Sequence, residues 1–183
     1  MLLVIKLLAD KEVHRVAVWD NQQITNIITQ SAVLDRLNAT HLGDFGKSTV
    51  EELNIGSQPV YTVDITDKTI NAFRLLRSKK LYAVAVVQRP GVIVSTISAK
   101  DVSTLCASHF SLLYAPISQF LAAVHSAEID IRTPSIVCKP TDSLATVIEK
   151  LSTNKIHRIY VLDAHSHPVK VITLTDIMYA LCH

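Results

Sequence analysis

Three stretches of the sequence follow the same pattern, and this repetition limits the possible folds more than any other feature. The copies run from Leu2 to Leu37, from Ile70 to Leu105 and from Leu144 to Leu181. Each begins with apolar residues at helical spacing and continues with a strand rich in β-branched residues, a polar turn, a second strand and a second helix. Repetition of this kind indicates one supersecondary unit that is used several times.

The second and third copies also carry an extended stretch upstream of the first helix. These stretches are PVYTVDITDKT, residues 59–69, and SIVCKPTDS, residues 135–143. A complete unit therefore reads strand, helix, strand, strand, helix, and the first copy is a partial unit because the sequence starts in the helix MLLVIKLLAD. We expect a mixed α/β (α+β) fold. The two complete units should pack as one pseudo-symmetric module, since each half-buried sheet needs a partner to cover it.

The expected segments follow from the positions of the copies. A partial unit that lacks its first strand covers residues 1–40, and a linker with a short helix covers residues 41–57. The complete units cover residues 58–105 and 131–183, and a connecting helix covers residues 106–130. Within the partial unit, the stretch up to Thr40 reads as the end of a helix.

Composition indicates a packed globular protein. Hydrophobic residues make up 49% of the chain and charged residues 19%, and the net charge is +2. This small excess favours neither nucleic acid nor an anionic membrane surface as a partner, and no apolar run approaches the roughly 18–20 residues of a membrane-spanning helix. The three cysteines form no CxxC pair, which is typical of buried thiols in a reducing compartment. We expect a location in the cytoplasm, with the nucleus as a further compartment.

A hydroxyl residue stands three positions before an aspartate at the entry to the last helix of both complete units. The third copy has Thr173 and Asp176, the second has Ser98 and Asp101, and the first has Ala32 in place of the aspartate. One interpretation is helix capping, which these residue types perform well. The other is ligand binding, because a helix N-terminus favours phosphate and a carboxylate can accept hydrogen bonds from ribose hydroxyls.

A His-Arg pair opens the central strand in two of the copies. The first copy reads EVHRVAVWD at residues 12–20 and the third reads KIHRIYVLD at residues 155–163, whereas the second has Tyr82-Ala83 at this place. The guanidinium group of arginine offers a planar set of donors suited to phosphate, and histidine adds another donor. The alternative is that these side chains contact carboxylates at a strand edge.

The unit and its motifs resemble the cystathionine-β-synthase (CBS) domain, two of which normally pair into a compact (Bateman) module. The stretch KSTVEELNIG between the first two copies, together with the His-Arg pairs, is also similar to the gamma subunits of AMP-activated (SNF1-type) protein kinases. On that alignment the three copies correspond to the second half of the second CBS unit and to the complete third and fourth units.

The resemblance implies a role for each motif residue. Ribose contacts fall to Asp101 and Asp176 and to the neighbouring hydroxyls of Ser98, Thr173 and Thr175. Phosphate contacts fall to His157 and Arg158, whereas His14 and Arg15 would reach a phosphate bound with an upstream unit. Lys100 departs from the apolar or hydroxyl residue expected beside the aspartate, and it would either add a phosphate contact or spoil the pocket.

The resemblance also places an adenine wall on the unit paired with each aspartate. For the Asp176 site the wall residues are Thr66, Asp67, Ala72 and Tyr82. For the Asp101 site they are Val137, Cys138 and Ile156. Such residues would form apolar core in any version of this fold, so they carry little weight alone.

Several ligands and partners follow from the same resemblance. The regulatory ligand would be AMP, ADP or ATP, with no metal required, and the partners would be the catalytic (alpha) and scaffold (beta) subunits of a kinase. A homodimer is expected in isolation, because the partial unit presents apolar surface. Nucleic acid and membranes are not expected partners.

Other functions are less well supported. The stretch GDFGKST, residues 43–49, lacks the first glycine of a P-loop, and Ser48 with Glu51 reads instead as a capping box. DAHSHP, residues 163–168, is a polar turn without a fourth metal ligand nearby. No nucleophile, base and acid recur in a recognisable arrangement, so an enzyme is not expected. The main alternative is a CBS scaffold or dimerisation module that binds no nucleotide. An NTPase would require observed hydrolysis.

Overall fold

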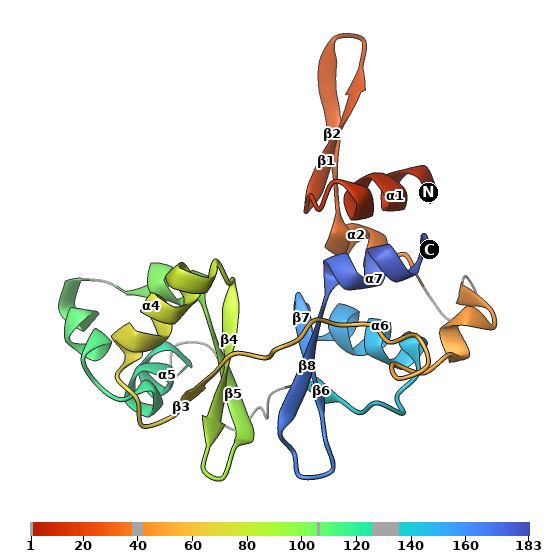
Figure 1. Cartoon of the computed structure of the whole chain (residues 1–183). Helices are drawn as coiled ribbons and strands as arrows, with labels where there is room; N and C mark the ends of the chain where they lie inside the picture. Colours follow the sequence, from red (N-terminus) through yellow and green to blue (C-terminus); the bar gives the residue numbers. More distant parts are fainter. Residues whose placement is uncertain (1, 38–41, 106, 126–135) are drawn as a thin grey trace. The chain divides into compact units, whose positions relative to one another are not determined.

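The computed structural model divides into two compact units (Figure 1). The residues described are 2–37, 42–105, 107–125 and 136–183. Unit 1 comprises Met1–Gln58, Val137–Leu162 and Val169–His183. Unit 2 comprises Pro59–Ile136 and Asp163–Pro168. The first copy of the repeat and nearly all of the third therefore belong to unit 1, and the second copy belongs to unit 2.

The first copy forms a helix, a hairpin and a short helix. These elements are α1 (Leu2–Asp10), β1 (Arg15–Asp20), β2 (Gln23–Thr29) and α2 (Gln30–Leu34). The two strands pair antiparallel, and no other strand of the described residues joins their sheet. Figure 1 shows the hairpin extending away from the helices of unit 1.

The third copy forms a complete unit. Its elements are β6 (Val137–Cys138), α6 (Leu144–Thr153), β7 (Arg158–Leu162), β8 (Pro168–Thr173) and α7 (Leu174–Ala180). The strand order is β6-β7-β8, and β6 runs parallel to β7. The side chain of Ser143 caps α6 by accepting a hydrogen bond from the backbone N–H of Thr146 at 3.2 Å. The predicted apolar face of α6 is buried, as its residues Leu144, Val147, Ile148 and Leu151 show.

Helices of the first copy pack on the last helix of the third. Both α1 and α2 contact α7, and Figure 1 shows the three helices side by side. Leu8 and Leu34 of the first copy and Ile177 and Met178 of the third are each at most 1% exposed. Burial of aliphatic side chains of this size contributes roughly 1.5–3 kcal/mol each. The partial unit is therefore held by the core of unit 1.

The second copy forms unit 2 around a three-stranded sheet of order β3-β4-β5. The elements of unit 2 are β3 (Thr62–Asp64), α4 (Thr69–Lys79), β4 (Ala83–Gln88), β5 (Val92–Ser98), η2 (Ala99–Thr104), η3 (Ala107–Leu113) and α5 (Ile117–His125). Of these, η3 and α5 follow the second copy in the sequence. The core joins β4 and β5 to α4 and α5 through Val84, Val86, Ile97, Leu76 and Phe120. The mixed α/β fold class predicted from the sequence is confirmed.

Several local predictions were wrong in detail. α2 ends at Leu34 and not near Thr40, because Arg36 and Leu37 close the last turn with short-range hydrogen bonds to the carbonyls of Val33 and Leu34. Residues 38–41 lie outside the described residues. The helix after β5 is a 3₁₀ helix, in which the Ser103 hydroxyl donates to the carbonyl of Lys100 at 2.7 Å. Such side-chain bonds compete with regular helix formation.

Two predictions about the connecting segments also change. The capping box lies one residue later than expected. The Thr49 N–H donates to the Glu52 carboxylate at 2.8 Å, and the Glu52 N–H donates to the Thr49 hydroxyl at 3.1 Å. Val50, between them, is buried. The connecting helix expected over residues 106–130 consists of η3 and α5 where it is described. Residues 106 and 126–130 of that stretch lie outside the described residues.

Candidate functional site

The same backbone hydrogen bond recurs in all three copies of the repeat. The residue before the central strand accepts it, and the first residue of the second helix donates it. The donor–acceptor pairs are Gln30–His14 at 3.1 Å, Ala99–Tyr82 at 2.9 Å and Leu174–His157 at 3.2 Å. This bond holds the start of the strand beside the start of the helix. In the third copy it therefore places the His-Arg pair beside the hydroxyl–aspartate motif.

The Asp176 carboxylate closes a capping box at the start of α7. Its Oδ2 atom accepts hydrogen bonds from the backbone N–H and the hydroxyl of Thr173, both at 2.7 Å. In return, the Asp176 N–H donates to the Thr173 hydroxyl at 3.3 Å. The capping interpretation is therefore geometrically correct. Within the described part of the chain, Oδ1 of Asp176 has no hydrogen-bond partner, so one carboxylate oxygen remains for a ligand.

The other two copies vary this arrangement. In the second, Oδ2 of Asp101 accepts from the backbone N–H of Ser98 at 2.7 Å, and Lys100 beside it is exposed. In the first, the Thr29 side chain accepts from the Ala32 N–H at 3.1 Å, but no carboxylate completes the box. The first copy therefore keeps the cap without the group that a ribose would need.

A buried glutamine at the start of α2 connects the first and third copies. Gln30 is 3% exposed, and its Nε2 atom donates to the Thr175 hydroxyl at 3.1 Å and to the carbonyl of Val13 at 3.3 Å. Its Oε1 atom lies 3.4 Å from Nδ1 of His14. The sequence analysis did not single out Gln30 as a functional residue. The available signal was that a polar residue stands where the other copies have Ala99 and Leu174.

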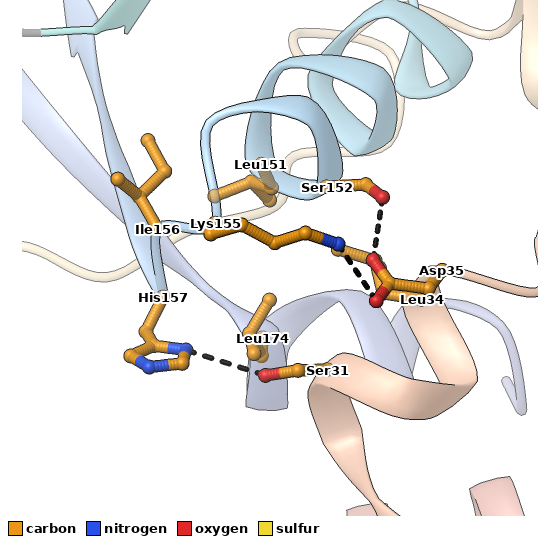
Figure 2. A pocket seen from close by; sticks show the side chains of 9 residues that line it. All are labelled: Ser31, Leu34, Asp35, Leu151, Ser152, Lys155, Ile156, His157 and Leu174. Carbon is orange, nitrogen blue, oxygen red and sulfur yellow. Dashed lines mark hydrogen bonds and ion pairs between the residues drawn. The ribbon is translucent and has the colours of Figure 1, made fainter.

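A small cavity lies where α2 meets α6 and the start of β7 (Figure 2). Its volume is about 100 Å³, and its lining includes Ser31, Asp35, Ser152, Lys155 and His157. Nδ1 of His157 lies 3.4 Å from the Ser31 hydroxyl. Small-molecule sites usually enclose roughly 300–1,000 Å³. This cavity is therefore too small for a whole nucleotide, although it adjoins one of the predicted phosphate ligands.

One carboxylate organises the edge of this cavity. Asp35 accepts a hydrogen bond from the Ser152 hydroxyl at 2.6 Å and one from Nζ of Lys155 at 2.9 Å (Figure 2). The Ser152 hydrogen bond, followed by the contact with Lys155, lowers the pKa of Asp35 below its ordinary value. Lys155 is therefore partly neutralised by a neighbour, whereas the His157 ring is exposed.

Unit 2 has a hollow at the equivalent place. It measures about 470 Å³ and is lined by Phe73, Leu76, Arg77, Lys80, Leu81, Tyr82, Ala99 and Val102. Lys80, Leu81 and Tyr82 occupy the repeat positions of Lys155, Ile156 and His157. The cavity of unit 1 is lined in part by α2, whereas no equivalent segment lines this hollow. Tyr82 is accordingly 64% exposed. The second copy therefore offers an aromatic surface where the third offers an imidazole.

The predicted adenine-wall residues differ in exposure within their own units. Thr66, Asp67 and Tyr82 are exposed, whereas Ala72 and Cys138 are at most 1% exposed. Val137 and Ile156 are partly buried. The Cys138 thiol donates weakly to the carbonyl of Tyr160 at 3.7 Å, and burial raises its pKa to about 12. Cys138 is therefore a neutral, apolar side chain near neutral pH.

The two motifs that resemble a P-loop (residues 43–49) and a metal site (residues 163–168) form ordinary turns in the structure. Phe45–Lys47 is a 3₁₀ turn in which the Lys47 ammonium pairs with Asp44 at 2.7 Å. The Asp163 carboxylate accepts from the backbone N–H groups of His165 and His167 at 2.9 and 2.8 Å, which forms a polar turn. Among the described residues, no group of histidine, cysteine or acidic side chains could hold a metal ion. None of the helices in the described segments is both long and apolar enough to span a bilayer.

Comparison with known proteins agrees with this architecture. Residues 127–183 match the CBS domain family. A regulatory gamma-1 subunit of SNF1-related protein kinase from Arabidopsis thaliana is 30% identical over 179 residues, which cover 88% of this chain and 42% of the relative. The chain therefore spans less than half the length of this curated relative.

Two solved structures share the fold. A Methanocaldococcus jannaschii protein, described as a candidate archaeal homologue of the AMP-activated kinase gamma subunit, has a TM-score of 0.73 at 18% identity, covering 98% of this chain and 63% of that protein. The CBS domain pair of protein MJ0100, in complex with 5′-methylthioadenosine and S-adenosyl-L-methionine, has a TM-score of 0.53 at 19% identity. It covers 71% of this chain and 96% of that protein.

Proposed function

We propose that this chain, a CBS-domain protein related to the gamma regulatory subunits of SNF1-type kinases, binds an adenine nucleotide as a regulatory ligand. The observation that carries the proposal is the hydrogen bond between Leu174 and His157. It keeps a carboxylate, suited to ribose, beside a His-Arg pair, suited to phosphate. Helix capping alone would explain Asp176, but it would not explain the adjoining His-Arg pair.

Asp176 is the proposed ribose ligand. Because Oδ2 is used by the cap, the carboxylate is fixed in orientation, and Oδ1 can accept hydrogen bonds from the two ribose hydroxyls. Bonds to an ionised carboxylate are stronger than bonds between neutral groups. Thr173 holds the Asp176 carboxylate in place, and Gln30 orients the Thr175 hydroxyl by donating a hydrogen bond to it.

Arg158 and His157 are the proposed phosphate ligands. Arg158 opens β7, directly after His157, and arginine matches the geometry of phosphate oxygens with two parallel donors. His14 and Arg15 occupy the equivalent place in the first copy and are proposed for a second phosphate position. Asp101, Ser98 and Lys100 are the matching candidates in unit 2. The adenine-wall residues remain predictions.

The nucleotide is proposed to be AMP, ADP or ATP, bound without a metal. The CBS domain pair of protein MJ0100 is in complex with adenosine compounds that lack phosphate, which supports recognition of the adenosine moiety in this fold. By analogy with the SNF1-related subunit, the kinase catalytic and scaffold subunits are the proposed partners, in the cytoplasm or nucleus. The alternative remains a CBS scaffold that binds no nucleotide.

Calorimetric titration of the chain with AMP, ADP, ATP and S-adenosylmethionine tests the proposal. Replacing Asp176 by Asn should weaken binding by roughly 1–3 kcal/mol, because a charge-assisted bond to the ribose is lost while the side chain keeps its size. Glu52→Gln is a matched control, since Glu52 closes a capping box at a distant place in the sequence. No binding to the wild-type chain would favour the scaffold. Equal binding by wild type and the Asp101→Asn/Asp176→Asn double variant would mean that both carboxylates are only helix caps.

A further inference from the structure

The side-chain amide of Gln30 has a fixed orientation inside unit 1. The side chain is 3% exposed, and its Nε2 atom donates to the carbonyl of Val13 at 3.3 Å. A backbone carbonyl can only accept a hydrogen bond, so the amide atom that faces it must be the nitrogen. The reversed amide would place two acceptors against each other. The Val13 carbonyl therefore determines which end of the amide meets each of its other neighbours.

This orientation sets the polarity of the two remaining contacts. Nε2 of Gln30 also donates to the Thr175 hydroxyl oxygen at 3.1 Å. An amide N–H can only donate, so the Thr175 hydroxyl accepts here and its own proton must be donated to a different group. The Oε1 atom can only accept, so Nδ1 of His14, at 3.4 Å, carries the proton of that contact. One buried amide thus fixes a hydroxyl of the third copy and an imidazole of the first.

The repeat shows what this glutamine changes. Ser31 and Thr175 occupy the same repeat position in the first and third copies. The Ser31 hydroxyl contacts the histidine of the other copy directly, at 3.4 Å from Nδ1 of His157. Thr175 instead reaches His14 through the amide of Gln30. A hydroxyl and an imidazole can each donate or accept, so the direct contact has no fixed direction. The inserted amide gives the Thr175 hydroxyl one direction only.

We propose that Gln30 is a positioning residue that selects a phosphate-bearing ligand at the Asp176 site. Thr175 stands directly before Asp176, and the neighbouring bond from Leu174 to His157 holds the same segment beside the His-Arg pair. Ionised phosphate oxygens only accept hydrogen bonds, so they match a hydroxyl that has to donate. The inference rests on the proposed nucleotide function. It adds the residue that makes the site distinguish AMP from adenosine.

The ratio of AMP affinity to adenosine affinity, measured by calorimetry of the full chain, tests this role. Thr175→Val removes the hydroxyl at nearly constant size and should lower the ratio roughly 10- to 100-fold, the scale of one hydrogen bond to a charged group. Thr175→Ser keeps the hydroxyl and should keep the wild-type ratio. Gln30→Met should lower the ratio by a smaller factor, because the hydroxyl loses only its fixed direction. Added to Thr175→Val, it should change the ratio no further.

Thr25→Val is the matched control. Thr25 lies on the exposed hairpin, where its hydroxyl donates to the Val18 carbonyl, so this change should leave the ratio as it is. A purely structural role of Gln30 and Thr175 would weaken AMP and adenosine equally. Such an unchanged ratio, with AMP still bound by wild type, would overturn this inference alone. Binding of neither ligand to the wild-type chain would overturn the proposed function and this inference together.

The tautomer of His14 tests the orientation of the amide without any ligand. Long-range nitrogen–proton NMR spectra of the wild-type chain, at a pH where the ring is neutral, should show His14 protonated at Nδ1. A neutral His14 protonated at Nε2 would contradict the polarity deduced from Gln30 and overturn the proposal. This measurement needs no substitution, so it decides the question even if Gln30→Met does not fold.

Discussion

Nζ of Lys155 lies 2.9 Å from Oδ2 of Asp35, although the two residues are 120 positions apart in the sequence. The contact fastens the end of α2, from the first copy, to the end of α6, from the third. Their side chains are 70% and 40% exposed, so water screens the pair and its contribution to stability is at most about 1 kcal/mol. The pair therefore positions the wall of the small cavity more than it stabilises the fold.

Asp35→Asn should destabilise the folded chain modestly near neutral pH. The pKa of Asp35 is lowered in the folded state from 3.8, chiefly by Ser152 and then by Lys155. A lowered pKa contributes stability above the unfolded-state value, and that contribution is lost as the pH falls through the folded-state value. Urea unfolding should therefore show a deficit at pH 7 that begins to shrink near pH 3.8 and disappears as the pH falls through the lower pKa of the folded state. A deficit that persists in acid would assign the effect to packing.

Gln30→Met should lower the free energy of unfolding more than a surface change on the neighbouring hairpin does. The substitution keeps the size of the buried side chain but leaves the Val13 carbonyl and the Thr175 hydroxyl without their shared donor. An unsatisfied buried polar group costs roughly 1–3 kcal/mol. Urea titration should show this loss, whereas the exposed Gln23→Met should change stability little. Equal effects of the two substitutions would mean that water replaces the amide.

The sequence was most informative where a pattern repeats. The buried face of α6, from Leu144 to Leu151, follows from helical spacing alone, and the strands β4 and β7 follow from runs of β-branched residues. Contacts between copies could not be predicted, since they join residues with no shared periodicity. Gln30 and Thr175 illustrate this, because neither position indicates by itself that the other lies 3.1 Å away.

The candidate site was predictable in part for the same reason. Thr173 and Asp176 are close in sequence, so their capping geometry follows from local rules. The position of Ser31 next to His157 depends instead on how α2 packs, and no sequence pattern indicates it. The contact of Asp35 with Lys155 is long-range as well, so the sequence does not indicate it either.

Cys138 should resist thiol reagents while the chain is folded. Its side chain is 1% exposed, and burial raises its pKa to about 12, so the reactive thiolate is scarce and inaccessible between pH 7 and pH 9. Iodoacetamide labelling followed by mass spectrometry should modify Cys182, which is partly exposed, well before Cys138. Denaturant should remove the difference. Rapid native labelling of Cys138 would contradict its place in the core.

Ala32→Asp should stabilise the chain by restoring the capping box that the first copy lacks. The Thr29 side chain already accepts from the backbone N–H of residue 32 at 3.1 Å, so a carboxylate there can reach the Thr29 N–H as Asp176 reaches Thr173. A completed box of this kind contributes about 0.5–1 kcal/mol. Ala32→Asn provides the same acceptor without the charge. A loss of stability in Ala32→Asp would mean that the start of α2 does not tolerate the geometry seen at the start of α7.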